Sequence, residues 1–299
     1  MGLRTTSVFV CILLFFCTAG TRAQGQSAAP TDTGNNSTKK AAVEEPEAST
    51  SEGTEALQKA TQNPVASLIS VPVQDNTNFG VYPGYRTQNV LNIQPVIPVG
   101  ISKDWNLIIR WITPIVYQPL PNAPGTPETG QYGLGDMTPS FFLSPKHPGK
   151  LIWGIGPVFQ LPTATSTYLG QGKLGLGPTI VALMQPGHWT LGVLANNVWS
   201  VAGSGSRPDV NQFLLQYFIN YNLKKGWFIT WQPTLTANWE APGNQKWTVP
   251  VFLAISQLQK SGRQPLQLQG GIGYNAIRPY QTATWFARFT VALLYPVAK

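Results

Sequence analysis

The chain has 299 residues, of which only 11% are charged, with 20 Lys plus Arg against 12 Asp plus Glu. Soluble domains carry about 25%. The chain is 42% hydrophobic, and its mean hydropathy is near zero, which argues against a membrane protein built from helices. This composition excludes disorder throughout the chain, and a total of two cysteines, Cys11 and Cys17, excludes a disulfide-rich scaffold.

Residues 1–23 have the layout of a secretory signal peptide. A basic start with Arg4 precedes an apolar run over residues 8–16, and a small-residue site ends the segment, so we expect cleavage before Gln24. The apolar run is shorter than the ~20 residues that a spanning helix needs.

Residues 24–63 have the composition of a disordered tether, because large apolar residues are almost absent and five glutamates between Glu44 and Glu55 make the segment acidic. Within residues 54–62, Ala56, Leu57 and Ala60 lie at helical spacing. A short helix and further linker are both compatible with this pattern, since a segment of this length is marginal as an isolated helix.

Residues 64–299 show the period-two alternation of β-strands. Over residues 105–117, for example, Trp105, Leu107 and Ile109 form an apolar face that alternates with a mixed face of Asn106, Ile108 and Arg110. No window of eighteen residues there is continuously apolar. The pattern predicts twelve strands, at 66–74, 87–99, 104–117, 135–144, 151–161, 174–184, 188–199, 211–222, 226–237, 246–257, 264–275 and 283–295.

The connections between these strands alternate between long and short, and the contrast fades near the end of the chain. Long connections are expected at 75–86, 118–133, 162–173 and 200–210, and short ones at 100–103, 145–150, 185–187 and 223–225. An even strand number with this alternation is typical of an antiparallel, up-and-down transmembrane β-barrel. A soluble sandwich or lipocalin-like barrel would carry Lys and Glu on its outer face, whereas these faces are apolar with Trp and Tyr near the strand ends. We therefore predict an all-β transmembrane barrel at 64–299, preceded by the tether.

Seven prolines fall inside the predicted strands. Proline cannot donate to a strand ladder, and a closed barrel has no edge to accommodate it, so we expect a repeated bulge or kink. An inserted residue would exchange inward and outward faces. The prolines are Pro95, Pro114, Pro139, Pro157, Pro178, Pro233 and Pro250.

The sequence carries no recognisable catalytic or metal-binding constellation. His147 and His188 lie in predicted short turns, and neither an HExxH motif nor a cysteine pair nor a carboxylate cluster indicates a metal site. We expect no cofactor. The basic residues of the body occupy separate tight turns without interleaved aromatic residues, so a nucleic-acid partner is not expected.

The predicted inward face is dominated by amides and hydroxyls. A lumen of this kind suits water or an uncharged or amphipathic solute, with a weak anion preference from its two arginines. In the alternative, these groups bond to one another and fill a closed barrel, since eight strands are filled by side chains and 16 to 18 strands enclose a wide channel. The candidate lumen-lining residues are Arg110, Arg288, Asp136, Gln94, Asn106, Gln160, Asn196, Gln216, Asn220 and Gln232.

An ordered series of segments resembles a bacterial envelope family related to the outer-membrane proteins encoded with meta-cleavage phenol degradation pathways, whose members are often mislabelled neuromedin U. The segments are QNPVASLISVPVQDN (62–76), LNIQPVIP (91–98), DWNLIIRWITPIV (104–116), GLGD (133–136), SFFLSPK (140–146), WGIGPVFQLPTAT (153–165), GLGPTIVAL (175–183) and WSVAG (199–203). The resemblance implies an outer-membrane β-barrel that transports hydrophobic or aromatic compounds and has no established catalytic site. Many such barrels end on an aromatic residue read by the outer-membrane assembly machinery, whereas here PVAK follows Tyr295.

Three hypotheses follow for the function. The leading one is a barrel in contact with outer-membrane lipid that lets small uncharged, hydrophobic or aromatic solutes cross. The second is a closed structural or adhesive barrel without transport. The third is an outer-membrane enzyme acting on lipid, which would depend on His188 or His147.

Overall fold

The computed structural model describes residues 46–122, 126–261 and 264–296. The predicted signal peptide and the first part of the predicted tether lie outside the described residues, and both stay predictions. The described part begins with the helix α1, Pro46–Thr61, which starts eight residues before the segment in which sequence reasoning placed a short helix. No helix in the described part of the chain is long and apolar enough to cross a bilayer.

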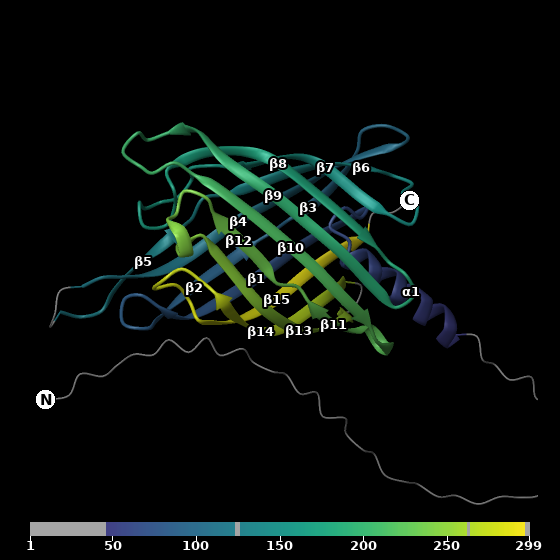
Figure 1. Cartoon of the computed structure of the whole chain (residues 1–299). Helices are drawn as coiled ribbons and strands as arrows, with labels where there is room; N and C mark the ends of the chain where they lie inside the picture. The colour runs from purple at the N-terminus through teal and green to yellow at the C-terminus, as the bar shows by residue number, and fades with distance from the viewer. Residues whose placement is uncertain (1–45, 123–125, 262–263, 297–299) are drawn as a thin grey trace, which may run out of the picture. The chain divides into compact units, whose positions relative to one another are not determined.

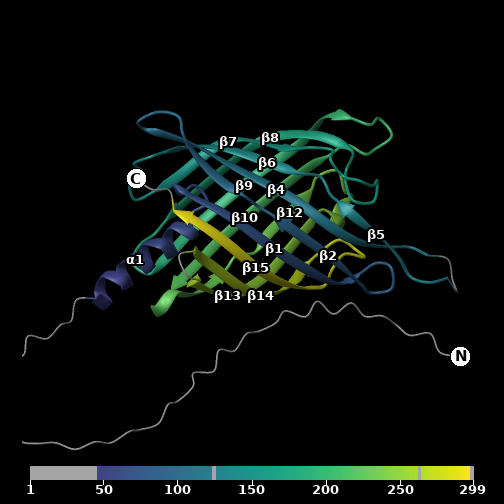
Figure 2. The ribbon, with the colours of Figure 1, turned by 180° about the vertical axis from the view of Figure 1, so that it is seen from behind.

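The remaining secondary structure is a closed antiparallel sheet (Figure 1). Within the described residues the sheet has 15 strand segments, and three pairs of segments are each one interrupted strand, so the barrel has 12 strands, as predicted. Figure 2 shows β15 beside β1, the pairing that joins the two ends of the chain. The segments are β1 Leu68–Val81, β2 Arg86–Ile93, β3 Val96–Gly100, β4 Trp105–Leu120, β5 Thr129–Leu134, β6 Thr138–Pro145, β7 Ile152–Gln160, β8 Lys173–Met184, β9 Trp189–Gly203, β10 Asn211–Asn222, β11 Trp227–Trp231, β12 Thr234–Asn238, β13 Trp247–Ser261, β14 Gln264–Ile277 and β15 Trp285–Pro296. Two short 3-10 turns, Lys224–Gly226 and Gly243–Gln245, complete the order.

The strands are apolar on the outside because their side chains alternate between lumen and exterior. In β13, Val251, Leu253 and Ile255 are more than half exposed on the outer face, whereas Phe252 and Ala254 are buried on the inner face. This alternation matches a wall whose exterior meets hydrocarbon.

Aromatic side chains gather toward both ends of the barrel. Near the short turns Trp189 packs against Tyr221 at 4.7 Å between ring centroids. Near the opposite rim Tyr274 packs against Trp285 at 4.6 Å. Two such zones are the aromatic girdles that the sequence predicted for a transmembrane barrel.

Of the bulge or kink expected at the prolines, the bulge is absent at five of the seven, and the kink stays a prediction. The pairing register is the same on both sides of Pro95 and Pro233, where β2–β3 and β11–β12 are merely interrupted. Pro139, Pro157 and Pro178 also sit in constant register, the last two directly opposite each other. Only Pro250 and Pro114 lie at register shifts. A barrel thus tolerates the loss of single ladder donors without inserting a residue.

The first connection on the long-loop side is shorter than the sequence predicted. Residues 75–86 were expected as a long loop, but β1 continues to Val81 and only residues 82–85 connect it to β2. Asp75 consequently lies on the outer face of β1. Its carboxylate accepts hydrogen bonds from the Thr77 hydroxyl (2.9 Å) and the Asn89 amide (2.6 Å), which satisfies both oxygens within the wall.

Candidate functional site: the barrel lumen

One mouth of the barrel is occupied by the chain's own N-terminal segment. We call residues 57–67, which comprise the end of α1 and the residues that follow it, the plug. The plug lies at the short-turn mouth (Figures 1 and 2). Four hydrogen bonds tie it to four places on the rim. They run from Gln58 Nε2 to the Trp227 carbonyl, from Gln62 Nε2 to Asn222 Oδ1, from Gln185 Nε2 to the Lys59 carbonyl and from Asn106 Nδ2 to Ser67 Oγ, at 2.7 to 3.1 Å.

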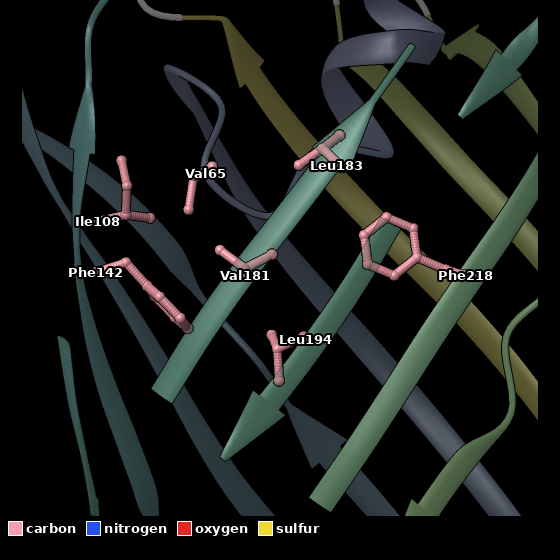
Figure 3. Close-up of a cluster of buried hydrophobic side chains, with 7 residues drawn as sticks. All are labelled: Val65, Ile108, Phe142, Val181, Leu183, Leu194 and Phe218. Atoms are coloured by element: carbon pink, nitrogen blue, oxygen red, sulfur yellow. The ribbon is translucent and has the colours of Figure 1, made fainter. Parts of the chain in front are cut away.

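The plug is also packed into apolar side chains of the inner wall. Figure 3 shows Val65 among residues of five strands, Ile108, Phe142, Val181, Leu183, Leu194 and Phe218. On the other half of the barrel, Leu57, Ala60 and Ala66 pack against Leu68, Leu258, Ala292 and Leu294. Gly154 faces Val65, and a Cβ there would lie 3.1 Å from Val65 Cγ1, so the glycine permits the close approach.

This apolar inner surface departs from the predicted lumen of amides and hydroxyls. Ile108 lies between Asn106 and Arg110, and Phe218 between Gln216 and Asn220, yet only these polar neighbours were among the predicted lumen residues. The missed signal was the position of Ile108 and Phe218 toward the short-turn ends of β4 and β10, together with the apolar residues Val65, just before β1, and Leu68, at its start. Apolar side chains at a mouth need a partner that excludes water, and the plug is that partner.

Inward of the plug lies a cavity of about 190 Å³, and residues 60–64 form part of its wall. Five of the predicted lumen residues line this cavity, namely Arg110, Gln94, Gln216, Asn220 and Gln232. Gln267, Gln269, Thr230 and Thr290 add polar groups, while Leu194, Phe218 and Phe228 add apolar ones. The structure therefore brings together residues from strands that are far apart in the sequence.

Among the described residues, Arg110 is the one charged residue that lines the cavity. It lies on β4, opposite Val96 and Ser140. Its guanidinium donates one hydrogen bond, from Nη2 to Gln94 Oε1 at 2.9 Å, and has no carboxylate within ion-pair distance among the described residues.

Arg288 also faces the lumen, but its guanidinium is occupied by the wall. Its Nε donates to Asn76 Oδ1 at 2.8 Å, and its Cζ lies 4.5 Å from the ring centroid of Phe252. Phe252 in turn stacks on Phe286 at 5.6 Å. A guanidinium held over an aromatic face in this way is stabilised in place by a cation–π contact.

The other predicted lumen residues lie elsewhere on the inner wall. Asn106 is at the short-turn mouth, where it donates to the plug. Asn196 faces inward on β9, opposite Thr179 and Leu214. Gln160 and Asp136 lie toward the long-loop mouth, with Gln160 Nε2 3.5 Å from Asp136 Oδ2.

Asp136 serves as an anchor for a loop rather than as a free lumen charge. Its two carboxylate oxygens accept the backbone N–H groups of Ala164 (3.2 Å) and Gln171 (2.6 Å), so they hold residues 162–172, which we call the anchored loop. Arg207 fixes the same loop from the other side, because its guanidinium donates to the carbonyls of Thr167, Gly170 and Gln171.

The anchored loop folds toward the lumen. Gly133 pairs with Val116 on the inner face, and a Cβ at Gly133 would meet both Thr165 Oγ1 and Leu169 Cδ1. Leu169 is buried at this place. The long-loop mouth is thus narrowed by a segment held mainly through hydrogen bonds.

A second loop at this mouth, residues 204–210 between β9 and β10, is held by an ion pair. Lys173 Nζ lies 3.1 Å from Asp209 Oδ1, and the Ser200 hydroxyl donates to the same carboxylate oxygen. The hydrogen bond from Lys173, its positive charge and the bond from Ser200 hold the pKa of Asp209 below its usual value.

The two histidines do not assemble a catalytic group. Both are exposed in short turns, His147 between β6 and β7 and His188 between β8 and β9, where its ring lies against Tyr221. Among the described residues, no group of three His, Cys, Asp or Glu side chains is placed to hold a metal ion.

Comparisons with known proteins bear on the fold. The sequence matches no protein-family model and no curated protein. Among solved structures, an outer membrane channel from Pseudomonas putida F1 is similar, with a TM-score of 0.58 and 14% identity over 76% of this chain and 94% of that chain. The NanC porin (TM-score 0.47, 9% identity, 77% of this chain and 100% of that chain) and the CymD monoaromatic hydrocarbon channel (0.42, 9%, 81% and 93%) are more distant. At this identity the first likeness shows the fold, an outer-membrane-type β-barrel.

Proposed function

We propose that the protein is an outer-membrane channel through which small uncharged, hydrophobic or aromatic solutes cross. The observation that carries the proposal is the lumen cavity, which combines amide and hydroxyl groups with apolar side chains inside a closed 12-stranded barrel. Such a mixture is typical of sites that bind small amphipathic molecules. The likeness to an outer membrane channel supports the same function.

Passage of a solute through the barrel requires the plug to move. Val65 and its apolar partners fill the short-turn mouth, so a solute that reaches the cavity from the long-loop side leaves only when the plug moves. The same packing favours a second candidate, a closed structural barrel in which the plug never moves. The two candidates differ in whether displacement of the plug changes permeability.

The purified full-length protein in liposomes tests the proposal. We expect swelling with arabinose and with phenyl glucoside, two uncharged solutes that cross lipid slowly. A matched control comes from Val65→Cys combined with Gly154→Cys, since a Cβ at residue 154 would lie 3.1 Å from Val65 Cγ1 and residues 18–299 contain no cysteine of their own. The reduced variant should swell like the natural protein and the disulfide-linked variant should not.

The outcomes separate the candidates. Swelling that is lost on oxidation supports a channel with a moving plug. No swelling with either solute in the natural protein and in the reduced variant contradicts the channel and favours the closed barrel.

A further inference from the structure

The wall of the lumen cavity has two chemically distinct parts on different strands. Phe218 on β10 and Phe228 on β11 lie on neighbouring strands and contribute aromatic rings. Arg110 lies on β4, which is separated from β10 by β6, β7, β8 and β9 around the sheet. The cavity therefore presents a cation from one side of the barrel and an apolar surface from another.

The charge of Arg110 is not balanced by the wall. Its guanidinium makes one hydrogen bond to an uncharged amide, and the part of the chain that the structure describes places no Asp or Glu in the cavity wall. A guanidinium has five N–H donors in a planar fork that matches a carboxylate. Most of that donor capacity therefore remains available to a ligand.

Further polar atoms in the same cavity lack partners. The hydroxyls of Thr230 (1% exposed) and Thr290 (7% exposed) make no hydrogen bond in the described structure, and neither does Gln62 Oε1 on the plug. Buried polar groups in proteins are nearly always paired, so unpaired ones around a cavity indicate a binding site. These atoms are independent of Arg110, because they come from β11, β15 and the plug.

We propose that this cavity binds a small monocarboxylate with an apolar body, such as a single-ring aromatic acid. The carboxylate pairs with Arg110, the ring packs against Phe218 and Phe228, and the threonine hydroxyls offer further hydrogen bonds to the ligand. The size is appropriate, since a cavity of about 190 Å³ exceeds the roughly 150 Å³ that holds benzene in an engineered apolar site. The inference rests on the proposed function for the ligand's route, and among the aromatic solutes proposed there it selects those that carry one carboxylate.

The cavity should discriminate by charge and by apolar surface. An uncharged analogue leaves Arg110 without a counter-charge, and an amine places two cations together. A carboxylate without an apolar body leaves the aromatic rings uncovered. Tight binding therefore needs both parts of the ligand.

Calorimetric titration of the full-length protein in detergent at fixed ionic strength tests this directly. The probes are benzoate, benzyl alcohol, benzylamine and acetate. We expect saturable binding of benzoate and at least about tenfold weaker binding of the other three, since a hydrogen-bonded charge pair corresponds to roughly 10- to 100-fold in affinity. Equal affinity for benzoate and benzyl alcohol would overturn the proposal, as would equal affinity for benzoate and acetate.

Two variants locate the site. Arg110→Gln should weaken benzoate binding about tenfold or more, while Arg288→Gln removes the same charge from a lumen arginine outside the cavity lining and should leave affinity within about twofold. Heat-modifiable gel mobility reports whether each variant is folded. Unchanged benzoate affinity in folded Arg110→Gln would overturn the assignment of Arg110 to the carboxylate. If that variant does not fold, the affinities of the natural protein for the four probes still decide whether the cavity selects an aromatic carboxylate.

Binding and passage can fail separately. Benzoate that binds in detergent while liposomes stay impermeable keeps the site and contradicts the channel. Liposomes that swell with arabinose while benzoate does not bind keep the channel and overturn the carboxylate site.

Discussion

The two mouths of the barrel are narrowed by different kinds of contact. At the short-turn mouth, the plug buries Val65, Leu57 and its alanines against apolar side chains from both halves of the wall. At the long-loop mouth, the anchored loop depends on Asp136 and Arg207, whose partners are backbone groups. Leu169 is the one large apolar side chain of that loop that is buried.

These two kinds of contact imply that the two mouths open at different free energies. Each hydrogen bond that is exchanged for water costs only about 0.5–1.5 kcal/mol net, and such bonds break one at a time. Withdrawal of the plug exposes several apolar side chains together, at roughly 1.5–3 kcal/mol for each. The long-loop mouth is therefore expected to open by local fluctuation, and the short-turn mouth only by displacement of the whole segment.

The largest expected effect follows from a charge placed inside the plug. Val65→Asp buries a carboxylate among Ile108, Phe142 and Phe218, apolar side chains that offer it no counter-charge. Burial of an unpaired ion costs several kcal/mol, and about 3 kcal/mol is enough to raise the unplugged population roughly 100-fold. We expect a large rise in open-channel time in planar bilayers.

Ser67→Asp is the matched control for that variant. It adds the same charge two residues away at an exposed position, where an aspartate oxygen still accepts from the Asn106 amide. Conductance should stay near that of the natural protein. If folded Val65→Asp conducts no more than Ser67→Asp, the plug is not the barrier.

The barrel itself was predictable because its physics is local to each strand. Period-two alternation in residues such as Val251, Phe252 and Leu253 reports directly on which face meets lipid and which faces inward. The break at Pro95 did not obscure this pattern, because the register is unchanged across it. The prediction of a loop at 75–86 was wrong because it took polar residues as a sign of a loop. In the structure, polar residues such as Asp75 continue the strand, since they bond to neighbours that sequence spacing does not show.

The lumen was only partly predictable because it depends on which strands meet across the barrel. Inward positions such as Arg110 and Gln216 could be derived from alternation, but their shared cavity could not. The plug was missed because residues 57–67 have too little apolar surface to indicate that they pack inside a barrel. Asp136 was placed near the lumen, yet its role as a loop anchor depends on Ala164 and Gln171, which lie far along the chain.

A smaller effect, on the local stability of the anchored loop, is expected at the long-loop mouth when Asp136 loses its charge. Asp136→Asn keeps one acceptor oxygen but weakens the bonds from the Ala164 and Gln171 N–H groups, by about 1–1.5 kcal/mol. Amide hydrogen exchange over residues 162–172 should become roughly fivefold to tenfold faster, while the global unfolding midpoint moves little.

Glu128→Gln provides the control for this variant. Glu128 is at the same rim, but its ion pair is with Arg86, at 3.2 Å, and not with a residue of the anchored loop. Exchange in residues 162–172 should not change in Glu128→Gln. Equal exchange rates in Asp136→Asn and the natural protein would show that Asp136 does not hold the loop.

The smallest expected effect is the pH dependence of the loop that the ion pair between Lys173 and Asp209 holds. Because Lys173 lowers the pKa of Asp209 in the folded protein, the pair stabilises the loop above the ordinary aspartate pKa of about 3.9. That contribution is lost as the pH falls through the lowered folded value, when the carboxylate takes up a proton. Selective carbon-13 labelling of aspartate should show Asp209 titrating below the ordinary value, and Lys173→Gln should move its midpoint upward. Because the Asp209 side chain is 75% exposed, the barrel should remain folded throughout this titration, so only the loop responds. A midpoint that Lys173→Gln leaves unchanged would mean that this loop, unlike the anchored loop, is held by its backbone alone.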